Sequence, residues 1–151
     1  MSGYLLDTSI LSAFAPGRPP LAKSVANWIV TQGEKQTLFI SVIAITEIEK
    51  GIRRLDRAGA TNRADSLTAW LNDTIEGFAD QILGINADIA RKAGRMEEAV
   101  SAKGKNPGLA DILIAATAAA NGLTVITANV RHFEALDVWC WNILQDPPGP
   151  D

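Results

Sequence analysis

The sequence predicts an α/β protein, built as a three-layer domain with a central parallel sheet of four to five strands flanked by helices. Short apolar runs alternate along the chain with longer segments of helical periodicity, which is typical of parallel strands joined by crossover helices. The short runs indicate strands that are covered on both faces of the sheet. A length of 151 residues suits one domain with its own core.

The N-terminal half of the chain is expected to contain two strands and four helices. A loop rich in proline and glycine, at 16–20, separates the first helix from the second. Ser41 is a suitable N-cap for the third helix, and Gly59 begins the break that follows it. In chain order, the expected elements are a strand at 3–6, helices at 7–14 and 21–30, a strand at 37–40, and helices at 41–58 and 62–78.

The C-terminal half is expected to supply the remaining strands and two long helices. Asn86 is a suitable cap for one helix, and Asn106 followed by Pro107 is expected to start the next. These elements are a strand at 81–85, a helix at 86–103, a turn at 105–108, a helix that ends at Gly122, a strand at 124–126 and an edge strand at 138–143. Residues 1–145 then form the single domain, and residues 146–151 are expected to be a disordered tail.

The bulk composition excludes several classes of protein. The net charge of −3 argues against a protein that binds nucleic acid through an overall basic surface. The single histidine, His132, argues against histidine-based nucleophilic or metal chemistry, and the single cysteine, Cys140, has no internal disulfide partner. No apolar run approaches the roughly 20 residues that span a bilayer, and no signal peptide begins the chain. We therefore expect a cytoplasmic protein without a membrane partner.

Two aspartates occupy positions that suit a functional site. Asp7 follows the first strand directly, and ligand sites in open α/β sheets lie at the carboxyl ends of strands. It is either a helix cap or one corner of such a site. Asp111 would stand about five residues into its helix if Asn106 is the cap, so capping does not explain it. The alternative for Asp111 is a solvated residue stabilised by the helix dipole.

Two further positions each have a functional and a non-functional explanation. Glu47 lies beside the apolar stripe of its helix, but Glu49 lies on the other flank, and periodicity alone does not choose between them. The alternative, which is the commoner one for such a position taken alone, is a surface glutamate paired with Lys50 or Arg54. Asn129 follows the strand at 124–126, in the same kind of position as Asp7, and its alternative is an ordinary turn asparagine.

Converging carboxylates would favour a particular kind of chemistry. Several acids in one place repel each other, so a cation among them is expected to keep them ionised. Oxygen ligands favour hard ions such as Mg²⁺ or Mn²⁺. An ion of this kind polarises a phosphoryl oxygen and generates hydroxide from water. Hydrolysis of phosphodiester bonds is the reaction that such a site suits best.

Four segments of the sequence also resemble the PIN-domain family. In order and spacing they are similar to the bacterial VapC-type toxin ribonucleases of type II toxin–antitoxin systems, and the resemblance extends from Tyr4 to about Ile143. The four segments are Leu5-Leu6-Asp7-Thr8-Ser9, Thr46-Glu47-Ile48-Glu49-Lys50-Gly51, Ala110-Asp111-Ile112-Leu113-Ile114-Ala115-Ala116 and Thr127-Ala128-Asn129-Val130-Arg131-His132-Phe133.

The resemblance implies a role for each candidate residue. Asp7, Glu47 and Asp111 would form an acidic triad around Mg²⁺ or Mn²⁺, so Glu47 is selected over Glu49. Asn129 would be the fourth catalytic position, where an amide orients water or binds weakly but cannot act as a base; one metal ion is therefore expected. The hydroxyls that would hold the acids in place belong to Thr8, Ser9 and Thr127. His132 is assigned no catalytic role.

The resemblance also implies an activity and partners. The protein would be a metal-dependent endoribonuclease that cuts tRNA or ribosomal RNA as the toxin of a toxin–antitoxin pair. Its partners would be the RNA substrate, a VapB-like antitoxin whose tail enters the acidic groove, and a second copy in a homodimer or a larger assembly. The alternative is a catalytically weak PIN scaffold that binds a partner protein or RNA. The intact acids favour the enzyme, whereas Asn129 favours the scaffold.

Overall fold

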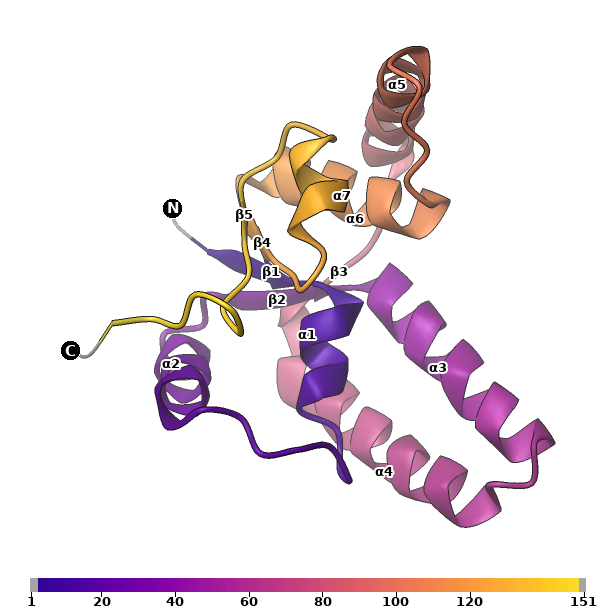
Figure 1. Ribbon diagram of the computed structural model, residues 1–151, viewed down its shortest axis with the longest axis vertical. Coiled ribbons are helices and arrows are strands. Elements are labelled where there is room, and N and C mark those ends of the chain that lie inside the picture. Colours follow the sequence, from indigo (N-terminus) through magenta and orange to yellow (C-terminus); the bar gives the residue numbers. More distant parts are fainter. Residues whose placement is uncertain (1–2, 150–151) are drawn as a thin grey trace.

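The computed structural model describes residues 3–149 and contains a five-stranded sheet in which all strands are parallel (Figure 1). The strand order is β3-β2-β1-β4-β5, so the first strand lies at the centre. Both the parallel sheet and the upper limit of five strands are confirmed. The strands are β1 (Tyr4–Leu6), β2 (Leu38–Ser41), β3 (Ile82–Leu83), β4 (Thr124–Ile126) and β5 (Cys140–Trp141).

Helices cover the sheet on both sides, which gives the expected three layers. In Figure 1, α5, α6 and α7 lie on one side of the sheet and α1 to α4 lie on the other. The helices are α1 (Thr8–Ala13), α2 (Lys23–Glu34), α3 (Val42–Arg57), α4 (Thr61–Phe78), α5 (Ala87–Ala102), α6 (Leu109–Asn121) and α7 (Val130–Glu134), with a short 3₁₀ helix at Ala79–Gln81. The helix α7 was not predicted.

Successive strand residues contribute to two separate cores. Leu5 and Val125 are fully buried beneath α5, α6 and α7, whereas Leu6 and Ile126 are buried on the side of α1 to α4. This alternation follows from the strand geometry, in which neighbouring side chains point to opposite faces. A strand buried on both faces has no polar position until it ends, so the first polar residue after β1 stands at the edge of the sheet.

Two of the three expected helix caps are confirmed. The Ser41 hydroxyl accepts a hydrogen bond from the Ile43 amide at 3.0 Å, and the Asn86 side chain accepts one from the Ile89 amide at 2.9 Å. The third expectation is wrong, because α6 begins at Leu109 with Gly108 as its N-cap. Gly108 is extended, with ψ at 157°, so the chain becomes helical only after the proline turn. Asp111 therefore lies in the first turn of α6.

The two edge strands are shorter than predicted. The 3₁₀ helix takes up Gln81, and β3 keeps only two residues of the expected strand at 81–85. Likewise, β5 keeps two residues of the expected strand at 138–143. The tail was expected to be disordered from Asp146 onward. The amide of Asp146, however, donates a hydrogen bond to the Asn142 carbonyl at 2.9 Å. Residues 147–149 are irregular, residues 150–151 lie outside the described part, and disorder there stays a prediction.

Trp28, Trp70 and Trp141 pack against the core on the side of α1 to α4, whereas Trp139 is 83% exposed. None of the helices in residues 3–149 is long and apolar enough to cross a membrane.

Candidate active site at the carboxyl ends of the strands

Asp7 is held by its backbone at the point where β1 becomes α1. Its amide donates to the Ile126 carbonyl at 2.9 Å, which ties the end of β1 to the end of β4. Its carbonyl accepts from the amides of Ile10 and Leu11, both at 3.0 Å, and so begins the helix. Asp7 occupies the N-cap position, but its side chain makes no cap hydrogen bond. Capping therefore does not explain a side chain that is only 2% exposed.

The Asp7 carboxylate is instead held by two hydroxyls. Thr127 and Ser9 donate to Oδ2 at 2.8 Å and 3.0 Å. Each hydroxyl in turn accepts from a backbone amide, that of Asn129 for Thr127 at 2.9 Å and that of Ala128 for Ser9 at 3.1 Å. Because the amides occupy the acceptor side of each hydroxyl, its proton is directed at Asp7. This arrangement fixes Oδ2 of Asp7.

The surroundings of Asp7 disfavour its charge overall. Burial raises the pKa of the Asp7 carboxyl, the hydroxyls of Thr127 and Ser9 oppose that rise, and the negative charge of Asp111 adds to it. The effect of Asp111 means that the two aspartates, 104 positions apart in the chain (111 − 7), lie near each other in the fold. A cation near both carboxylates would offset the cost of the buried charge.

Asp111 has a close partner on α7. The Nδ1 atom of His132 lies 2.8 Å from Oδ2 of Asp111, whose side chain is 20% exposed. An ionised carboxylate only accepts hydrogen bonds, so a hydrogen bond from His132 to ionised Asp111 requires the tautomer that carries a proton on Nδ1. Sequence reasoning assigned His132 no role. One signal could have pointed to His132. The chain passes from a strand into the short helix α7 at Asn129, and this change places His132 in the first turn of that helix.

Glu47 and Glu49 differ clearly in their surroundings. Glu47 is partly buried on α3 and accepts a hydrogen bond from the Thr8 hydroxyl at 2.6 Å, so it is joined to the residue that follows Asp7. Glu49 is exposed and forms an ion pair with Arg53, one turn along, at 3.5 Å. Glu49 is therefore the surface glutamate that pairs with a neighbouring cation. The expected holding of the acids by Thr8, Ser9 and Thr127 is confirmed.

Asn129 completes the set of expected residues from the N-cap position of α7. Its side chain makes no cap hydrogen bond and the residue is exposed, so its contribution to the Asp7 network is its backbone amide.

Within residues 3–149, no three histidine, cysteine, aspartate or glutamate side chains are close enough together to hold one metal ion. Asp7 and Asp111 carry like charges, and the Glu47 carboxylate is bonded to the Thr8 hydroxyl. The triad of Asp7, Glu47 and Asp111 thus stays a prediction, as does the catalytic role of Asn129.

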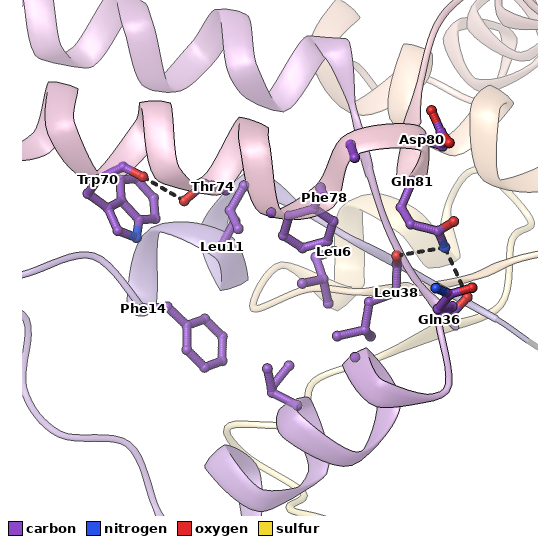
Figure 2. A pocket seen from close by; sticks show the side chains of 14 residues that line it. Leu6, Leu11, Phe14, Gln36, Leu38, Trp70, Thr74, Phe78, Asp80 and Gln81 are labelled. Carbon is purple, nitrogen blue, oxygen red and sulfur yellow. Dashed lines mark hydrogen bonds between the residues drawn. The ribbon is translucent and has the colours of Figure 1, made fainter.

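A separate apolar cavity lies below the sheet between α1, α2 and α4. Its volume is about 560 Å³. Figure 2 shows large apolar side chains around it, and Gln81 at one end bonded to the main chain of Gln36 and Leu38. Among its lining residues Asp80 is the only titratable one. Because reaction chemistry needs converging polar groups, this cavity is a poor candidate for the reacting centre.

The fold and the site together define a class: a parallel α/β domain with two interacting carboxylates at the carboxyl ends of its strands. The family follows from the sequence profile of the PIN domain, which matches residues 4–138. The chain belongs to the PIN domain family.

Named relatives match most of the chain. It is 30% identical over 143 residues to the FitB toxin of Neisseria gonorrhoeae, which covers 94% of this chain and 99% of that protein. It is 29% identical over 131 residues to a VapC ribonuclease of Sinorhizobium fredii, with coverage of 87% and 90%. A solved structure of VapBC-5, a member of the VapBC family of toxin–antitoxin systems from Mycobacterium tuberculosis, superposes with a TM-score of 0.60 at 26% identity, covering 90% of each chain.

Proposed function

We propose that this protein is a metal-dependent endoribonuclease that hydrolyses phosphodiester bonds in tRNA or ribosomal RNA, as the toxin of a toxin–antitoxin pair. The observation that carries the proposal is the buried Asp7 carboxylate, fixed through Oδ2 by two hydroxyls and interacting with Asp111. The names of its relatives, a VapC ribonuclease and the FitB toxin, support the same activity and the same biological role.

The donor set fits a hard divalent cation. Asp7, Asp111 and Glu47 offer only carboxylate oxygens, the ligands that suit Mg²⁺ or Mn²⁺. When bound, such an ion supplies polarisation of the phosphoryl oxygen and a more acidic water. The protein's part is to hold Asp7 through Ser9 and Thr127, and to orient Asp111 through His132. The Asn129 amide would position water and would not remove its proton.

The partners follow from the same role. We propose that a VapB-like antitoxin covers the acidic site, and that the toxin forms a homodimer within a larger toxin–antitoxin assembly. The VapBC-5 structure, which belongs to a toxin–antitoxin family, supports the antitoxin partner. We place the protein in the cytoplasm, where its proposed substrates occur.

Removal of one proposed ligand tests the function directly. Purified protein should cleave RNA with Mg²⁺ or Mn²⁺ and lose cleavage in EDTA. Asp111→Asn should lower the cleavage rate by about 10²-fold or more, since loss of a residue that merely supports a metal ligand already costs 10–100-fold. The metal should also raise the melting temperature of the wild type more than that of the variant, because an ion that binds only the folded state stabilises it.

The exposed Asp65 on α4 provides the control, since Asp65→Asn makes the same change away from the site. If Asp111→Asn and the wild type cleave equally, the nuclease assignment to this site is wrong. A wild type that binds RNA but never cleaves it would favour the scaffold. Growth arrest on expression, relieved by Asp111→Asn, would support the toxin role.

The hydroxyl network provides a second, smaller test. Thr127→Val keeps the shape of a fully buried side chain but removes the donor to Asp7 and the acceptor of the Asn129 amide. We expect a 10–100-fold weaker metal affinity and a loss of about 1–3 kcal/mol of stability. The measurements are metal titration by calorimetry and denaturant unfolding.

Thr117→Val is the matched control, because Thr117 is equally buried but donates to the Leu113 carbonyl within α6. It should leave metal affinity unchanged. Equal metal affinities for Thr127→Val and the wild type would show that the hydroxyl does not position Asp7.

A further inference from the structure

A second cavity lies beside the candidate active site, between the segment 105–108 and α7. Its volume is about 590 Å³. Lys105, Arg131 and His132 line it, and Glu134 is the only acid in its lining. The chain as a whole carries a net charge of −3, whereas basic side chains outnumber acidic ones in the lining of this cavity.

The cavity and the site share one side chain. His132 lines the cavity, and its Nδ1 atom lies 2.8 Å from Oδ2 of Asp111. The two helices that carry these residues, α6 and α7, lie on the same side of the sheet (Figure 1). The cavity is therefore separated from a proposed metal ligand by a single imidazole ring.

The two long cations are accessible to a ligand. Lys105 and Arg131 line the cavity, and no ion pair joins either of them to an acid within residues 3–149. Arg53 on α3 differs, because Glu49 and the Thr68 hydroxyl already contact it. A phosphate group would gain charge-assisted hydrogen bonds from Lys105 and Arg131 without displacing an internal partner.

We infer that this cavity is the subsite for an RNA phosphate next to the one that is cut, with Lys105 and Arg131 as its binding groups. The inference rests on the proposed nuclease function. A substrate that approaches two carboxylates in an acidic protein is repelled, and local cations beside the site offset this repulsion. Contacts to backbone phosphates position a nucleic acid without reading its bases, so the subsite sets the register of the chain and not its sequence preference.

The test measures RNA binding separately from cleavage. A fluorescein-labelled single-stranded RNA of about 16 nucleotides, the upper end of the 4–16 nucleotides that one single-strand-binding OB fold contacts, is titrated by anisotropy in EDTA at several salt concentrations. Lys105→Gln/Arg131→Gln should weaken binding about tenfold at low salt. It should also reduce the slope of log affinity against log salt by about 0.7 for each RNA phosphate that the protein no longer neutralises.

Two further variants make the result specific. Lys103→Gln/Arg95→Gln removes the same charge from side chains that line a different cavity, and it should leave affinity and slope close to those of the wild type. Glu134→Gln removes the acid from the cavity and should strengthen RNA binding, a change that misfolding does not produce. With metal present, Lys105→Gln/Arg131→Gln should raise KM and change kcat little.

The outcomes separate this inference from the proposed function. If the wild type cleaves RNA, but Lys105→Gln/Arg131→Gln binds RNA with the same affinity and the same salt slope as the wild type, the subsite is wrong and the nuclease assignment stands. No RNA binding by the wild type in EDTA also overturns the subsite. Unchanged RNA binding with weaker binding of the antitoxin would assign the cavity to that protein instead. Failure of the wild type to cleave with any metal would reject the nuclease.

Discussion

Asp7→Asn should abolish RNA cleavage and, in EDTA, make the protein more stable. A loss of about 10³-fold or more is expected, because this change removes charge from the most buried of the proposed ligands. The stability should rise because burial and the charge of Asp111 raise the pKa of the Asp7 carboxyl, so its ionised form costs free energy in the folded state. The melting temperature in EDTA should therefore be higher for Asp7→Asn than for the wild type.

The sign of the pH dependence follows from the same shift. The folded pKa of Asp7 lies above the unfolded value, so the folded state binds more protons between the two values. The stability of the wild type in EDTA should therefore fall as the pH rises from the unfolded pKa of aspartate through the folded one, and stay lower above it. Asp7→Asn should lack this component. Denaturant unfolding of both proteins across that pH range measures the difference.

Asp65→Asn is the control for this pair of effects, because Asp65 is exposed and the change should leave cleavage and stability nearly unaltered. If Asp7→Asn lost both stability and activity, Asp7 would be a structural acid that the fold needs in ionised form. A stable variant with full activity would remove Asp7 from the site.

Phe133→Ala should cause the largest loss of stability among these changes. Phe133 is fully buried and is the only buried residue of α7. Truncation of a buried phenylalanine typically costs about 3–5 kcal/mol, a large part of the roughly 5–15 kcal/mol that stabilises a domain. Because α7 also carries Arg131 and His132, the contact with Asp111 should loosen. Urea unfolding measures the loss, and metal titration measures the second effect.

Leu109→Ala on α6 is the matched control, since Leu109 is 60% exposed and its truncation should change stability by less than about 0.5 kcal/mol. If Phe133→Ala were as mild as this control, α7 would not be anchored by its packing against the core. A large loss of stability with unchanged metal affinity would show that the His132 contact does not depend on that anchor.

Much of the fold was predictable because its signals are local. The strand at Tyr4–Leu6 is a short apolar run that ends at Asp7, and the helix after Ser41 begins with a side-chain cap and continues with a long amphipathic pattern. The helix α7 was missed because its five residues make less than two turns, too few to show a period. The start of α6 was misplaced because Gly108 is extended after a proline turn.

The sequence by itself determined the parallel sheet, the PIN family and the position of Asp7 at a strand end, because strand burial and parallel topology put the first polar residue at that edge. Only the tertiary structure decided the partners of the acids: Thr127 with Asp7, Thr8 with Glu47, and His132 with Asp111. These contacts join elements that are far apart in the chain, and they depend on how the helices pack on the sheet, which no local pattern encodes.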